Sequence, residues 1–523
     1  MTVAQAVGET LVGVGVDHVF GVVGSGNFHV TNAMVASGAR FVAARHEGGA
    51  ATMADAYSRM SGTVAALTVH QGCGLTNAMT GIAEAAKSRT PLVVVAAEAS
   101  QPRSNFYVDQ EALAQSVGAV PFRVTSAGSA VEVTVQAVAT AVHGRRTVLL
   151  NLPLEVQGLE VGSVASTRLP AAPAPVEPSA SRVTALAALL EKSERPVFIA
   201  GRGARSDHAG TALEALAERS GALVATSAVA RGLFNGNPWS LDVSGGFASP
   251  LAAELIRGAD IIVGWGCALN MWTMRQGSLI GPNATVVQVD DDADAIGAHR
   301  DVHLGVVGDV STTARAVLAA VRPAREGYRS PQVRDSIAAQ IRWRDVAFAD
   351  TSTPDRIDPR VLSIELDDVL PPDRIVSVDS GNFMGYPSMF LSVPDERGFC
   401  FTQAFQSIGL GLPTAIGAAL AQPDRLPVAA LGDGGAMMSA AELDTVRRLE
   451  LPMVVVVYND DAYGAEVHHF GPDGFSLETV SFPPTDIAAV ARGYGFEAVT
   501  VRTAADLEPV SRWVSGNRNS PLL

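Results

Sequence analysis

Short runs of apolar residues recur along the chain and alternate with longer segments in which apolar residues follow a helical period. In the first third of the chain, these runs occupy residues 19–23, 40–44, 64–69, 92–97 and 147–152. Continuous apolar runs of this length are typical of parallel strands covered by helices on both faces, because neither face of such a strand meets water. Residues 1–161 are therefore predicted to form a doubly wound α/β domain.

The same alternation starts again after a segment rich in proline and alanine at residues 169–175. Such a composition is typical of an extended linker between folded units. Beyond it, the apolar runs at residues 196–201 and 259–264 indicate the strands of a second unit. The pattern predicts a central α/β domain over residues 181–321.

A third series of alternating elements occupies residues 356–523. Its clearest strands are predicted at residues 426–431 and 453–458, with a helix at residues 440–449 between them. A chain of 523 residues is too long for one hydrophobic core, so three domains also agree with the length. The predicted fold class is α/β, with three doubly wound domains whose sheets are mostly parallel.

The composition argues against several classes of protein. The formal net charge is −15 and the isoelectric point is about 5.1, which argues against nucleic acid as a partner because its phosphates would be repelled. No apolar run reaches the length of a membrane span, and the mildly polar N-terminus does not resemble a signal peptide. Cys73, Cys267 and Cys400 lack metal-binding spacing. We therefore expect a cytoplasmic protein without disulfides or zinc.

Two aspartates directly follow the last two predicted strands. Asp433 comes after residues 426–431 within a Gly-Asp-Gly-Gly sequence, and Asp460 comes after residues 453–458. The carboxyl ends of neighbouring parallel strands meet at one ligand crevice. Mg²⁺ prefers oxygen ligands and often shares them with phosphates, and glycines let the backbone approach such groups closely. The pattern therefore indicates a site for Mg²⁺ and a diphosphate.

This stretch resembles the diphosphate-binding motif of thiamine diphosphate (ThDP) enzymes, in which GDG is followed after a fixed gap by NN or ND. The resemblance implies that the carboxylates of Asp433 and Asp460 and the carbonyl of Ala462 bind Mg²⁺. The family usually has asparagine where Asp460 stands, so this chain adds a negative charge beside the diphosphate. Further cofactor contacts implied by the motif are Gly432, Gly434, Gly435, Tyr463 and Gly464.

Glu47 lies between a predicted strand, residues 40–44, and a predicted helix, residues 50–60. An acid near a helix N-terminus is stabilised by the helix dipole, which is a sufficient structural reason for its presence. The sequence HEGGAA around Glu47 also resembles the HEQGAA pattern of ThDP enzymes. The resemblance implies that Glu47 hydrogen-bonds the aminopyrimidine of the cofactor and activates it by general acid–base catalysis.

The segment Gln406–Pro413 resembles the TMGFGLP segment of acetolactate synthases. In this family the cofactor is bent over a bulky apolar side chain. The resemblance implies that Ile408 is this wedge, and that the carbonyl of Gln406 accepts a hydrogen bond from the 4′-amino group of the cofactor.

The segment His70–Asn77 resembles the TSGPGATN loop of acetolactate synthases, but His70 replaces threonine and Cys73 replaces proline. A histidine at this position is similar to the active-site histidine of benzoylformate decarboxylase. Because a neutral imidazole can transfer a proton near pH 7, His70 is a candidate for protonating the carbon that has lost CO₂. The alternative is that His70 only hydrogen-bonds a loop carbonyl.

Other residues of the first domain are expected to approach the substrate. The loop at residues 24–27 matches the family's loop beside the substrate, so Ser25 or Asn27 is a candidate for contacting a carboxylate. Gln110 falls where acetolactate synthases have a Gln-Glu pair near the substrate. The resemblance therefore implies a substrate contact for Gln110 as well.

The segment after the metal motif contains two adjacent histidines, His468 and His469, and departs here from the acetolactate synthase pattern. Family loops at this place cover the reacting carbon. Adjacent side chains on a helix point about 100° apart, so only one of the two is expected to face the site. His468 and His469 are therefore candidate catalytic residues, and the alternative is that they lie on the surface or at an interface.

The segment Gly201–Ala204 resembles the AGRGA segment of acetolactate synthases. In those enzymes the central domain can bind FAD, and in relatives acting on acyl-CoA it can bind ADP. A GRGA turn falls short of the GxGxxG pattern with its acidic partner. Tightly bound FAD is therefore not expected.

Over nearly its whole length, the chain is identified as a member of the acetolactate synthase/pyruvate decarboxylase-like group of ThDP enzymes. The resemblance implies a homodimer or homotetramer with active sites at the subunit interface, where Glu47 of one subunit meets Asp433 and Asp460 of another. The favoured activity is decarboxylation of a 2-oxo acid followed by carboligation to a second carbonyl.

Three alternatives to carboligation stay open. The first is a decarboxylase that releases an aldehyde, which His70 would favour. The second is a lyase acting on 2-hydroxyacyl- or oxalyl-CoA, but the sequence offers no convincing basic site for the CoA phosphates. The third is a ThDP-fold protein without catalysis, against which Glu47 and the metal motif argue.

Overall fold

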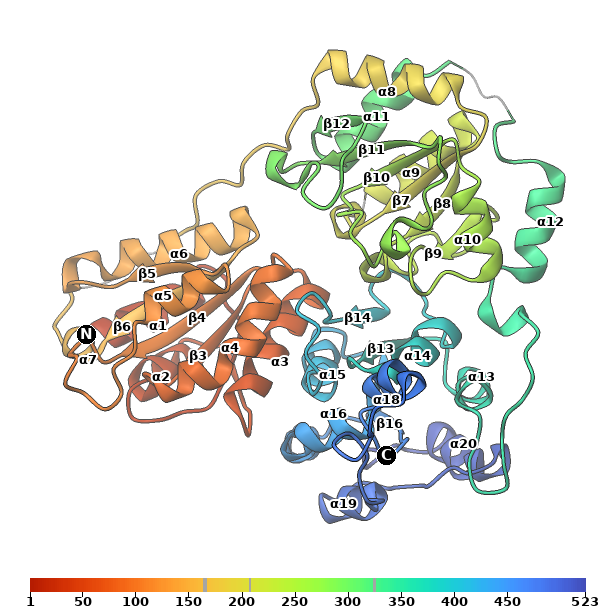
Figure 1. The fold of residues 1–523 in the computed structure, drawn as a ribbon. Helices are drawn as coiled ribbons and strands as arrows, with labels where there is room; N and C mark the ends of the chain where they lie inside the picture. Colours follow the sequence, from red (N-terminus) through yellow and green to blue (C-terminus); the bar gives the residue numbers. More distant parts are fainter. Residues whose placement is uncertain (163–166, 207, 323–325) are drawn as a thin grey trace.

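The computed structural model describes residues 1–162, 167–206, 208–322 and 326–523. Three sheets are built from residues 18–153, 196–307 and 374–458 (Figure 1). Neighbouring strands run parallel in all three sheets, so the predicted fold class is confirmed. We call the parts built on these sheets the first, central and third domains. Among the described residues, no helix combines the length and apolar character needed to cross a bilayer.

The first domain has a six-stranded sheet with the strand order β2-β1-β3-β4-β6-β5. Its strands are β1 (His18–Gly21), β2 (Arg40–Ala43), β3 (Ala65–Val69), β4 (Leu92–Glu98), β5 (Val120–Arg123) and β6 (Thr147–Pro153). Its helices are α1 (Val3–Gly13), α2 (Phe28–Ala36), α3 (Glu47–Ser61), α4 (Cys73–Lys87), α5 (Gln110–Ser116), α6 (Ala130–Gly144) and α7 (Leu154–Gln157). The five predicted strands are confirmed. β5 was not predicted, because it is a short edge strand that is only half-buried and lacks a continuous apolar run.

The central domain has a six-stranded sheet with the order β12-β11-β10-β7-β8-β9. Its strands are β7 (Pro196–Ala200), β8 (Leu223–Thr226), β9 (Ser240–Val243), β10 (Ile261–Trp265), β11 (Thr285–Asp290) and β12 (Leu304–Val307). Its helices are α8 (Ala180–Lys192), α9 (Ala209–Ser220), α10 (Pro250–Arg257), α11 (Val310–Ala320) and α12 (Pro331–Gln340). The two strands predicted here correspond to β7 and β10, the central pair of the sheet.

The third domain has a four-stranded sheet with the order β14-β13-β15-β16. Its strands are β13 (Arg374–Val378), β14 (Phe399–Phe401), β15 (Leu426–Gly432) and β16 (Val454–Tyr458). Its helices are α13 (Pro359–Val369), α14 (Gly385–Phe390), α15 (Gly411–Ala421), α16 (Asp433–Met438), α17 (Leu443–Arg448), α18 (Gly464–Phe470), α19 (Ile487–Gly493) and α20 (Glu508–Ser515). Both strands predicted here are confirmed, and the predicted helix at residues 440–449 is a 3₁₀ turn that continues into α17.

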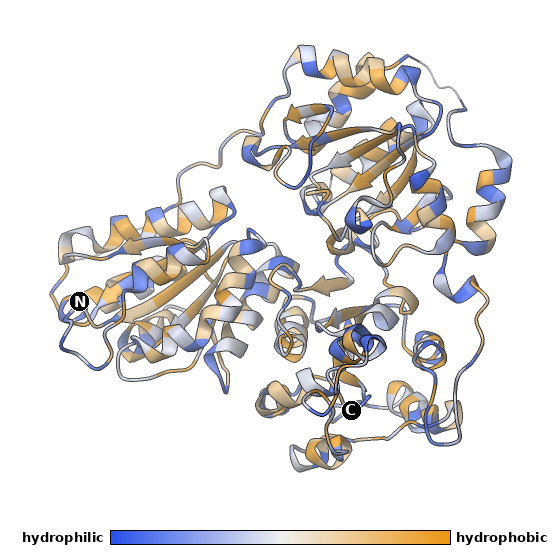
Figure 2. Ribbon diagram, viewed as in Figure 1, coloured by the Kyte–Doolittle hydropathy of each residue, from blue (hydrophilic) through white to orange (hydrophobic). Residues whose placement is uncertain are grey.

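Helices cover both faces of each sheet. In the first domain, one core contains residues of α1, α2 and α6, and the core on the opposite face contains residues of α3 and α4. The central domain likewise has one core with α8, α9 and α11 and another with α10 and α12. Figure 2 shows the apolar residues concentrated on the strands and on the inward faces of the helices. Burial on both faces explains why the strands are continuous apolar runs.

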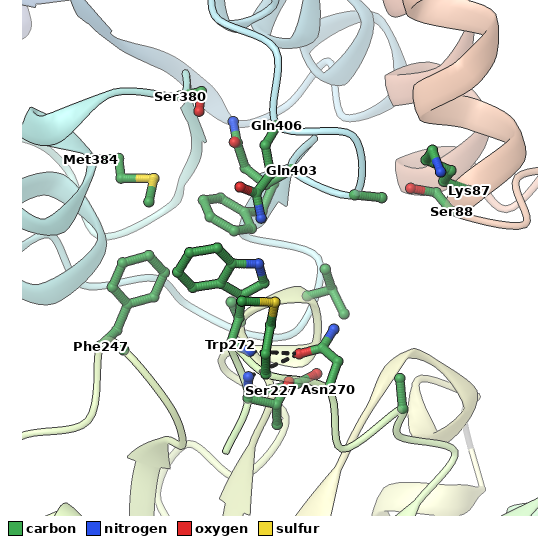
Figure 3. A pocket seen from close by; sticks show the side chains of 18 of the residues that line it. Lys87, Ser88, Ser227, Phe247, Asn270, Trp272, Ser380, Met384, Gln403 and Gln406 are labelled. Carbon is green, nitrogen blue, oxygen red and sulfur yellow. Dashed lines mark hydrogen bonds between the residues drawn. The ribbon is translucent and has the colours of Figure 1, made fainter. Parts of the chain in front are cut away.

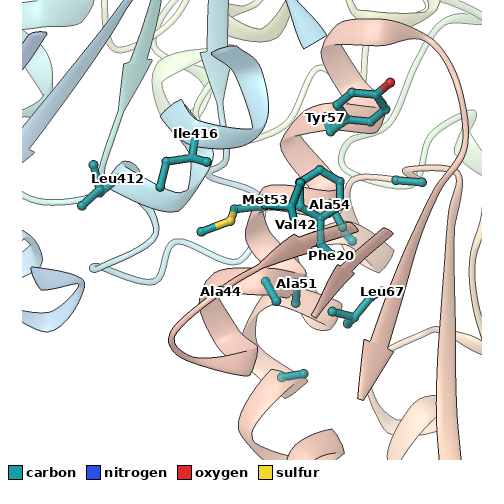
Figure 4. Close-up of a cluster of buried hydrophobic side chains, with 14 of the residues drawn as sticks. Phe20, Val42, Ala44, Ala51, Met53, Ala54, Tyr57, Leu67, Leu412 and Ile416 are labelled. Atoms are coloured by element: carbon teal, nitrogen blue, oxygen red, sulfur yellow. The ribbon is translucent and has the colours of Figure 1, made fainter. Parts of the chain in front are cut away.

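The first and third domains share one hydrophobic core, in which α3 packs on α15 (Figure 4). Met53 of α3 and Leu412 and Ile416 of α15 belong to this core. A Cβ atom at Gly417 would collide with the backbone carbonyl of Met53. Glycine at this position therefore lets the two helices approach closely, and the two domains are held together by their contact.

In each sheet the strand order changes direction beside its first strand, and ligand crevices form at such points beyond the carboxyl ends of the strands. The change lies between β1 and β3 in the first domain, between β7 and β10 in the central domain, and between β13 and β15 in the third domain. The loops that follow these strands carry Ser25, His70, Gly201 and Asp433. The topology thus brings the predicted site residues to the ligand-binding edges of the sheets.

Candidate active site

A cavity of about 1730 Å³ opens between the three domains (Figure 3). The cofactor-binding residues predicted in the third domain all line it: Gln406, Ile408, Gly432, Asp433, Gly434, Gly435, Asp460, Ala462, Tyr463 and Gly464. Lys87 of the first domain and Phe247 and Trp272 of the central domain also line the cavity. Large concave pockets at domain junctions are where small ligands and cofactors bind.

Asp433 and Asp460 stand at the ends of paired strands. β15 and β16 are neighbours, with Gly432 opposite Tyr458, so the residues that follow them lie side by side. Burial and the nearby carboxylate of Asp460 raise the pKa of Asp433 to about 6. Two carboxylates in close contact are an oxygen-rich, negatively charged donor set, and a divalent cation between them would remove their repulsion.

Glycines allow the two loops around these aspartates to touch. A Cβ atom at Gly434 would lie 2.8 Å from Cε1 of Tyr463, and one at Gly464 would collide with the Asp460 carboxylate. One at Gly435 would collide with the carboxylate of Asp379. The glycine-rich motif therefore has a packing reason in addition to the close approach of a ligand.

Asp379 is a site residue that the sequence analysis missed. It follows β13 and accepts hydrogen bonds from the backbone N–H groups of Ser380, Gly409 and Leu410 at 2.8, 2.9 and 3.1 Å. Burial raises its pKa to about 6, although the backbone donors oppose this. Asp379 thereby fixes the turn that leads from Ile408 into α15. The available signal was a polar Asp-Ser-Gly-Asn sequence directly after an apolar run, as at Asp433.

Further residues that were not predicted line the same cavity. Ser380, Gly381 and Asn382 follow Asp379 at the end of β13, and Glu466 projects from α18. Gln403 also lines the cavity, and both polar atoms of its amide are buried without a partner in the protein. The strand β13 begins with the buried Arg374, and a charged residue at its start hid the strand from a search for apolar runs.

Glu47 is the first residue of α3 and is partly exposed. The side-chain amide of Asn77 donates a hydrogen bond to its carboxylate at 3.1 Å. A Cβ atom at Gly74 would lie 3.5 Å from Oε1 of Glu47 and 3.0 Å from Cβ of His70, so these two side chains flank the start of α4. The predicted position of Glu47 at a helix N-terminus is confirmed. Glu47 does not line the cavity that contains Asp433.

His70 lies beside Ser25. Its Nδ1 atom is 3.0 Å from the carbonyl of Gln71, which can only accept, so Nδ1 carries the proton and donates it to this bond. The unprotonated Nε2 atom faces the hydroxyl of Ser25 at 3.4 Å. The ring edge packs against Phe106, and a Cβ atom at Gly24 would collide with the imidazole. His70 therefore binds a loop carbonyl, as one reading predicted, and still has a nitrogen free to accept a proton.

The amides of Asn27 and Gln110 are satisfied within the protein. Asn27 is buried; it accepts a hydrogen bond from the N–H of Gly24 and donates to Val22 and Thr68. Gln110 is also buried. It accepts from the N–H of Gly72 and donates to Asn151. The two amides shape the Ser25 and His70 loops from inside, which leaves Ser25 as the exposed side chain of the pair predicted there.

The two histidines of α18 are exposed, and neither lines the cavity. The ring of His469 packs edgewise on Phe470. Ala465 and Glu466 are the residues of this helix that line the cavity beyond Gly464. Neither histidine lines this cavity within the described chain, so a catalytic role for His468 or His469 stays a prediction.

In the central domain, the Gly201–Ala204 turn packs against the loop after β10. The N–H of Gly203 donates to the carbonyl of Gly266 at 3.1 Å. At the end of β11, Asp292 pairs with Arg89 at 2.9 Å and Asp291 pairs with Arg145 at 2.5 Å, both arginines coming from the first domain.

Comparison with known proteins bears on all three domains. Family models of thiamine pyrophosphate enzymes match the N-terminal TPP binding domain at residues 1–119, the central domain at residues 183–317 and the C-terminal TPP binding domain at residues 379–523. Thiamine pyrophosphate is another name for ThDP. The three matched segments together cover most of the chain.

The chain is 29% identical to a sulfoacetaldehyde acetyltransferase of Castellaniella defragrans, over 97% of this chain and 90% of that protein. It is 27% identical to an acetolactate synthase large subunit of Parasynechococcus marenigrum (strain WH8102), over 97% and 84%. A ThDP-dependent 4-hydroxybenzoylformate decarboxylase of Rhodococcus jostii RHA1 has the same fold, with a TM-score of 0.84, 24% identity and coverage of 100% and 98%. The chain therefore belongs to the thiamine diphosphate-dependent enzymes of the acetolactate synthase/pyruvate decarboxylase-like family.

Proposed function

We propose that this enzyme uses ThDP and Mg²⁺ to decarboxylate a 2-oxo acid, and that His70 returns a proton to the carbon that has lost CO₂. The observation that carries this proposal is the geometry of His70, whose Nε2 atom faces the Ser25 hydroxyl beside Glu47. Nε2 can take up a proton from water and pass it to the carbon, after which the imidazole returns to this tautomer. The expected product is an aldehyde.

The residues of the third domain fit the cofactor. The carboxylates of Asp433 and Asp460 and the carbonyl of Ala462 would hold Mg²⁺, and through it the diphosphate, because all three offer oxygen ligands. The carbonyl of Gln406 and the side chain of Ile408 would contact the two rings. When bound, ThDP supplies a carbon that accepts the electrons of the bond broken on loss of CO₂.

Glu47 and His70 would move the protons. A carboxyl group at a helix N-terminus, oriented by Asn77, is suited to sharing a proton with the aminopyrimidine N1′. Ser25 donates to Nε2 of His70, and either group could contact the substrate carboxylate. We propose that Ser25 and His70 contact the substrate, and that Asn27 and Gln110 hold the loops of Ser25 and His70 in shape.

We further propose that a second copy of the chain completes the site. Glu47, Ser25 and His70 do not line the cavity that contains Asp433, although the chemistry needs both groups around one cofactor. Large apolar side chains are exposed next to each half. Phe28, Phe106 and Tyr107 lie beside Ser25 and His70, and Met437 and Met438 belong to α16. Exposed apolar patches of this kind mark interfaces, and a two-fold dimer would bring each half against its complement.

Carboligation is a second candidate. It is favoured by the similarity to an acetolactate synthase and a sulfoacetaldehyde acetyltransferase. In this case the carbon that has lost CO₂ would form a bond to a second carbonyl or acceptor in place of taking the proton of His70.

Product analysis separates the two candidates. The enzyme is incubated with ThDP, Mg²⁺ and each of a panel of 2-oxo acids, from pyruvate to aromatic ones, and the products are identified by NMR. An aldehyde formed together with CO₂ supports the decarboxylase. A 2-hydroxyketone or an acetohydroxy acid supports carboligation, and the absence of turnover with all 2-oxo acids contradicts both.

A further inference from the structure

The loop at residues 404–410 carries both predicted contacts to the cofactor rings, Gln406 and Ile408. The loop lies between β14 and α15. Its backbone is strained, because Gln406 has φ +66°, a left-handed conformation that residues other than glycine rarely adopt. Such a conformation persists only where the surrounding structure holds it in place. The groups that hold this loop therefore decide where the Gln406 carbonyl and the Ile408 side chain lie.

Two buried carboxylates hold the loop, one near each end. Asp379 accepts the N–H groups of Gly409 and Leu410. At the other end, Glu84 of α4 accepts the N–H groups of Ala404 and Phe405 at 3.0 and 2.6 Å. Glu84 is fully buried and belongs to the first domain, so its bonds cross a domain boundary.

Arg59 of α3 keeps Glu84 charged and in place. Its guanidinium donates to the Glu84 carboxylate at 2.8 Å and to the carbonyl of Phe401, just before the loop, at 3.0 Å. Burial would raise the pKa of Glu84, but Arg59 and the two backbone donors outweigh it and hold the pKa below its ordinary value. Hydrogen bonds to a charged group are stronger than neutral ones, so Glu84 holds the loop most firmly as a carboxylate.

Asp55 offers a natural comparison. It is as buried as Glu84 and pairs with the same guanidinium, at 2.8 Å from Nε of Arg59. Among the described residues its carboxylate bonds Arg59 and not the loop, and burial raises its pKa. Glu84 and Asp55 thus share a partner and an environment, and they differ in whether they touch residues 404–405.

We propose that Glu84, supported by Arg59, is a positioning residue that holds the 404–410 loop in the conformation needed to receive the rings of ThDP. This inference rests on the proposed function, because it assigns Gln406 and Ile408 to the cofactor. α3 also begins at Glu47, and α4 begins at Cys73, shortly after His70. The same two helices therefore support the loop at one end and the proton-transfer residues at the other.

The test compares Glu84→Gln with Asp55→Asn in the full-length protein. Glutamine keeps the size of the side chain but loses its negative charge. Its amide can also place an N–H group against the backbone N–H donors of Ala404 and Phe405. Amide hydrogen exchange of residues 402–410 is measured without cofactor, and the affinity for ThDP is measured calorimetrically in the presence of Mg²⁺. For Glu84→Gln we expect exchange at residues 404–406 to be at least about tenfold faster and ThDP affinity to be about tenfold lower. For Asp55→Asn we expect a lower melting temperature with both quantities near those of the unmodified protein.

The inference is overturned if the two variants lose thermal stability equally while loop exchange and ThDP affinity stay unchanged. If Glu84→Gln does not fold, Ser88→Ala provides a milder test, because the Ser88 hydroxyl donates to Glu84 at 3.1 Å and bonds Arg59 at 2.6 Å. A protein that does not bind ThDP at all contradicts the proposed function. The exchange measurement, made without cofactor, still shows whether Glu84 holds the loop.

Discussion

The two halves of the site are built differently. The half in the third domain is concave: Asp433, Asp460 and their glycines lie in a cavity between three domains, and Asp379 braces the turn behind them. The half in the first domain is a surface. Glu47 is partly exposed, Ser25 is exposed, and both lie outside that cavity. The third-domain half is shaped to hold a charged ligand, whereas the first-domain half is an open surface.

This difference separates binding from chemistry. A cation and a diphosphate need several oxygen and N–H groups converging from one body, which loops at the ends of neighbouring strands provide. Proton transfer needs few groups in a water-poor environment. If a second copy covers the first-domain half, that environment forms only on assembly. Variants in each half should therefore affect different steps, either cofactor binding or proton transfer.

The largest expected effect is that of Glu47→Gln. Glutamine fits the same space but cannot exchange a proton, so turnover should fall by about 10²- to 10⁴-fold, the usual contribution of a general acid–base group. ThDP binding should be nearly unchanged, because the binding residues lie in the third domain. Steady-state kinetics and calorimetry measure the two quantities. Asp433→Asn is the opposite case, with loss of ThDP and Mg²⁺ binding; equal loss of binding in both variants would contradict the division.

His70→Ala should alter the fate of the carbon that loses CO₂. Without the imidazole, the rate of aldehyde release should fall by about 10²-fold, while any ligated product should fall less. The ratio of the two products by NMR is the measurement. Cys73→Ala is the matched control: its sulfur lies 3.9 Å from Nδ1 of His70, and it is assigned no role in proton transfer. An unchanged product ratio in His70→Ala would remove this residue from the mechanism.

Mixing two inactive variants tests the shared site. In a dimer with sites at the interface, a mixed dimer of Glu47→Gln and Asp433→Asn has one site with both changes and one with neither. After subunit exchange of a 1:1 mixture, about a quarter of the unmodified activity should return, because half of the dimers are mixed and each has one intact site. Each variant alone is the control. Activity that stays at the level of the separate variants would place both halves of the site in one chain.

The smallest expected effect is on the pH dependence of stability. The pKa of Asp433 in the folded protein is raised to about 6 from 3.8. Its protonated form is therefore favoured by folding, and this contribution to stability is lost as pH rises from about 4 to about 6. Without metal, the melting temperature of the unmodified protein should fall over this range relative to Asp433→Asn. Mg²⁺ with ThDP should reverse the trend, because binding favours the ionised carboxylate; the same pH profile in both proteins would argue against the close carboxylate pair.

Local sequence was sufficient for much of the fold and for the third-domain half of the site. Apolar runs marked five strands of the first domain and two strands in each of the other domains, because a strand buried on both faces must be apolar throughout. Asp433 and Asp460 could be placed side by side from their positions after two such runs. Of the strands that were not predicted, β13 begins with a buried arginine and β5 is a half-buried edge strand, and both features interrupt the apolar signal.

The rest of the site depended on contacts between distant segments. Asp379 braces the turn beside the cavity, and Glu466 and Gln403 line it, through the packing of segments that no local motif encodes. His468 and His469 carry suitable chemistry but are exposed on α18 and do not line the cavity. Asn27 and Gln110 have the residue types of ligand contacts, yet neighbouring loops already satisfy their amides.

The sequence by itself determined the three α/β domains and the position of the two aspartates, because these follow from local periodicity and short spacings, and the resemblance of its motifs indicated the cofactor family and Glu47. Only the tertiary structure decided that the two halves of the site face different surroundings and that Glu84 reaches across a domain boundary to the 404–410 loop. The physical reason is that a side chain's partners depend on how whole sheets and helices pack, whereas its secondary structure depends mainly on its near neighbours along the chain.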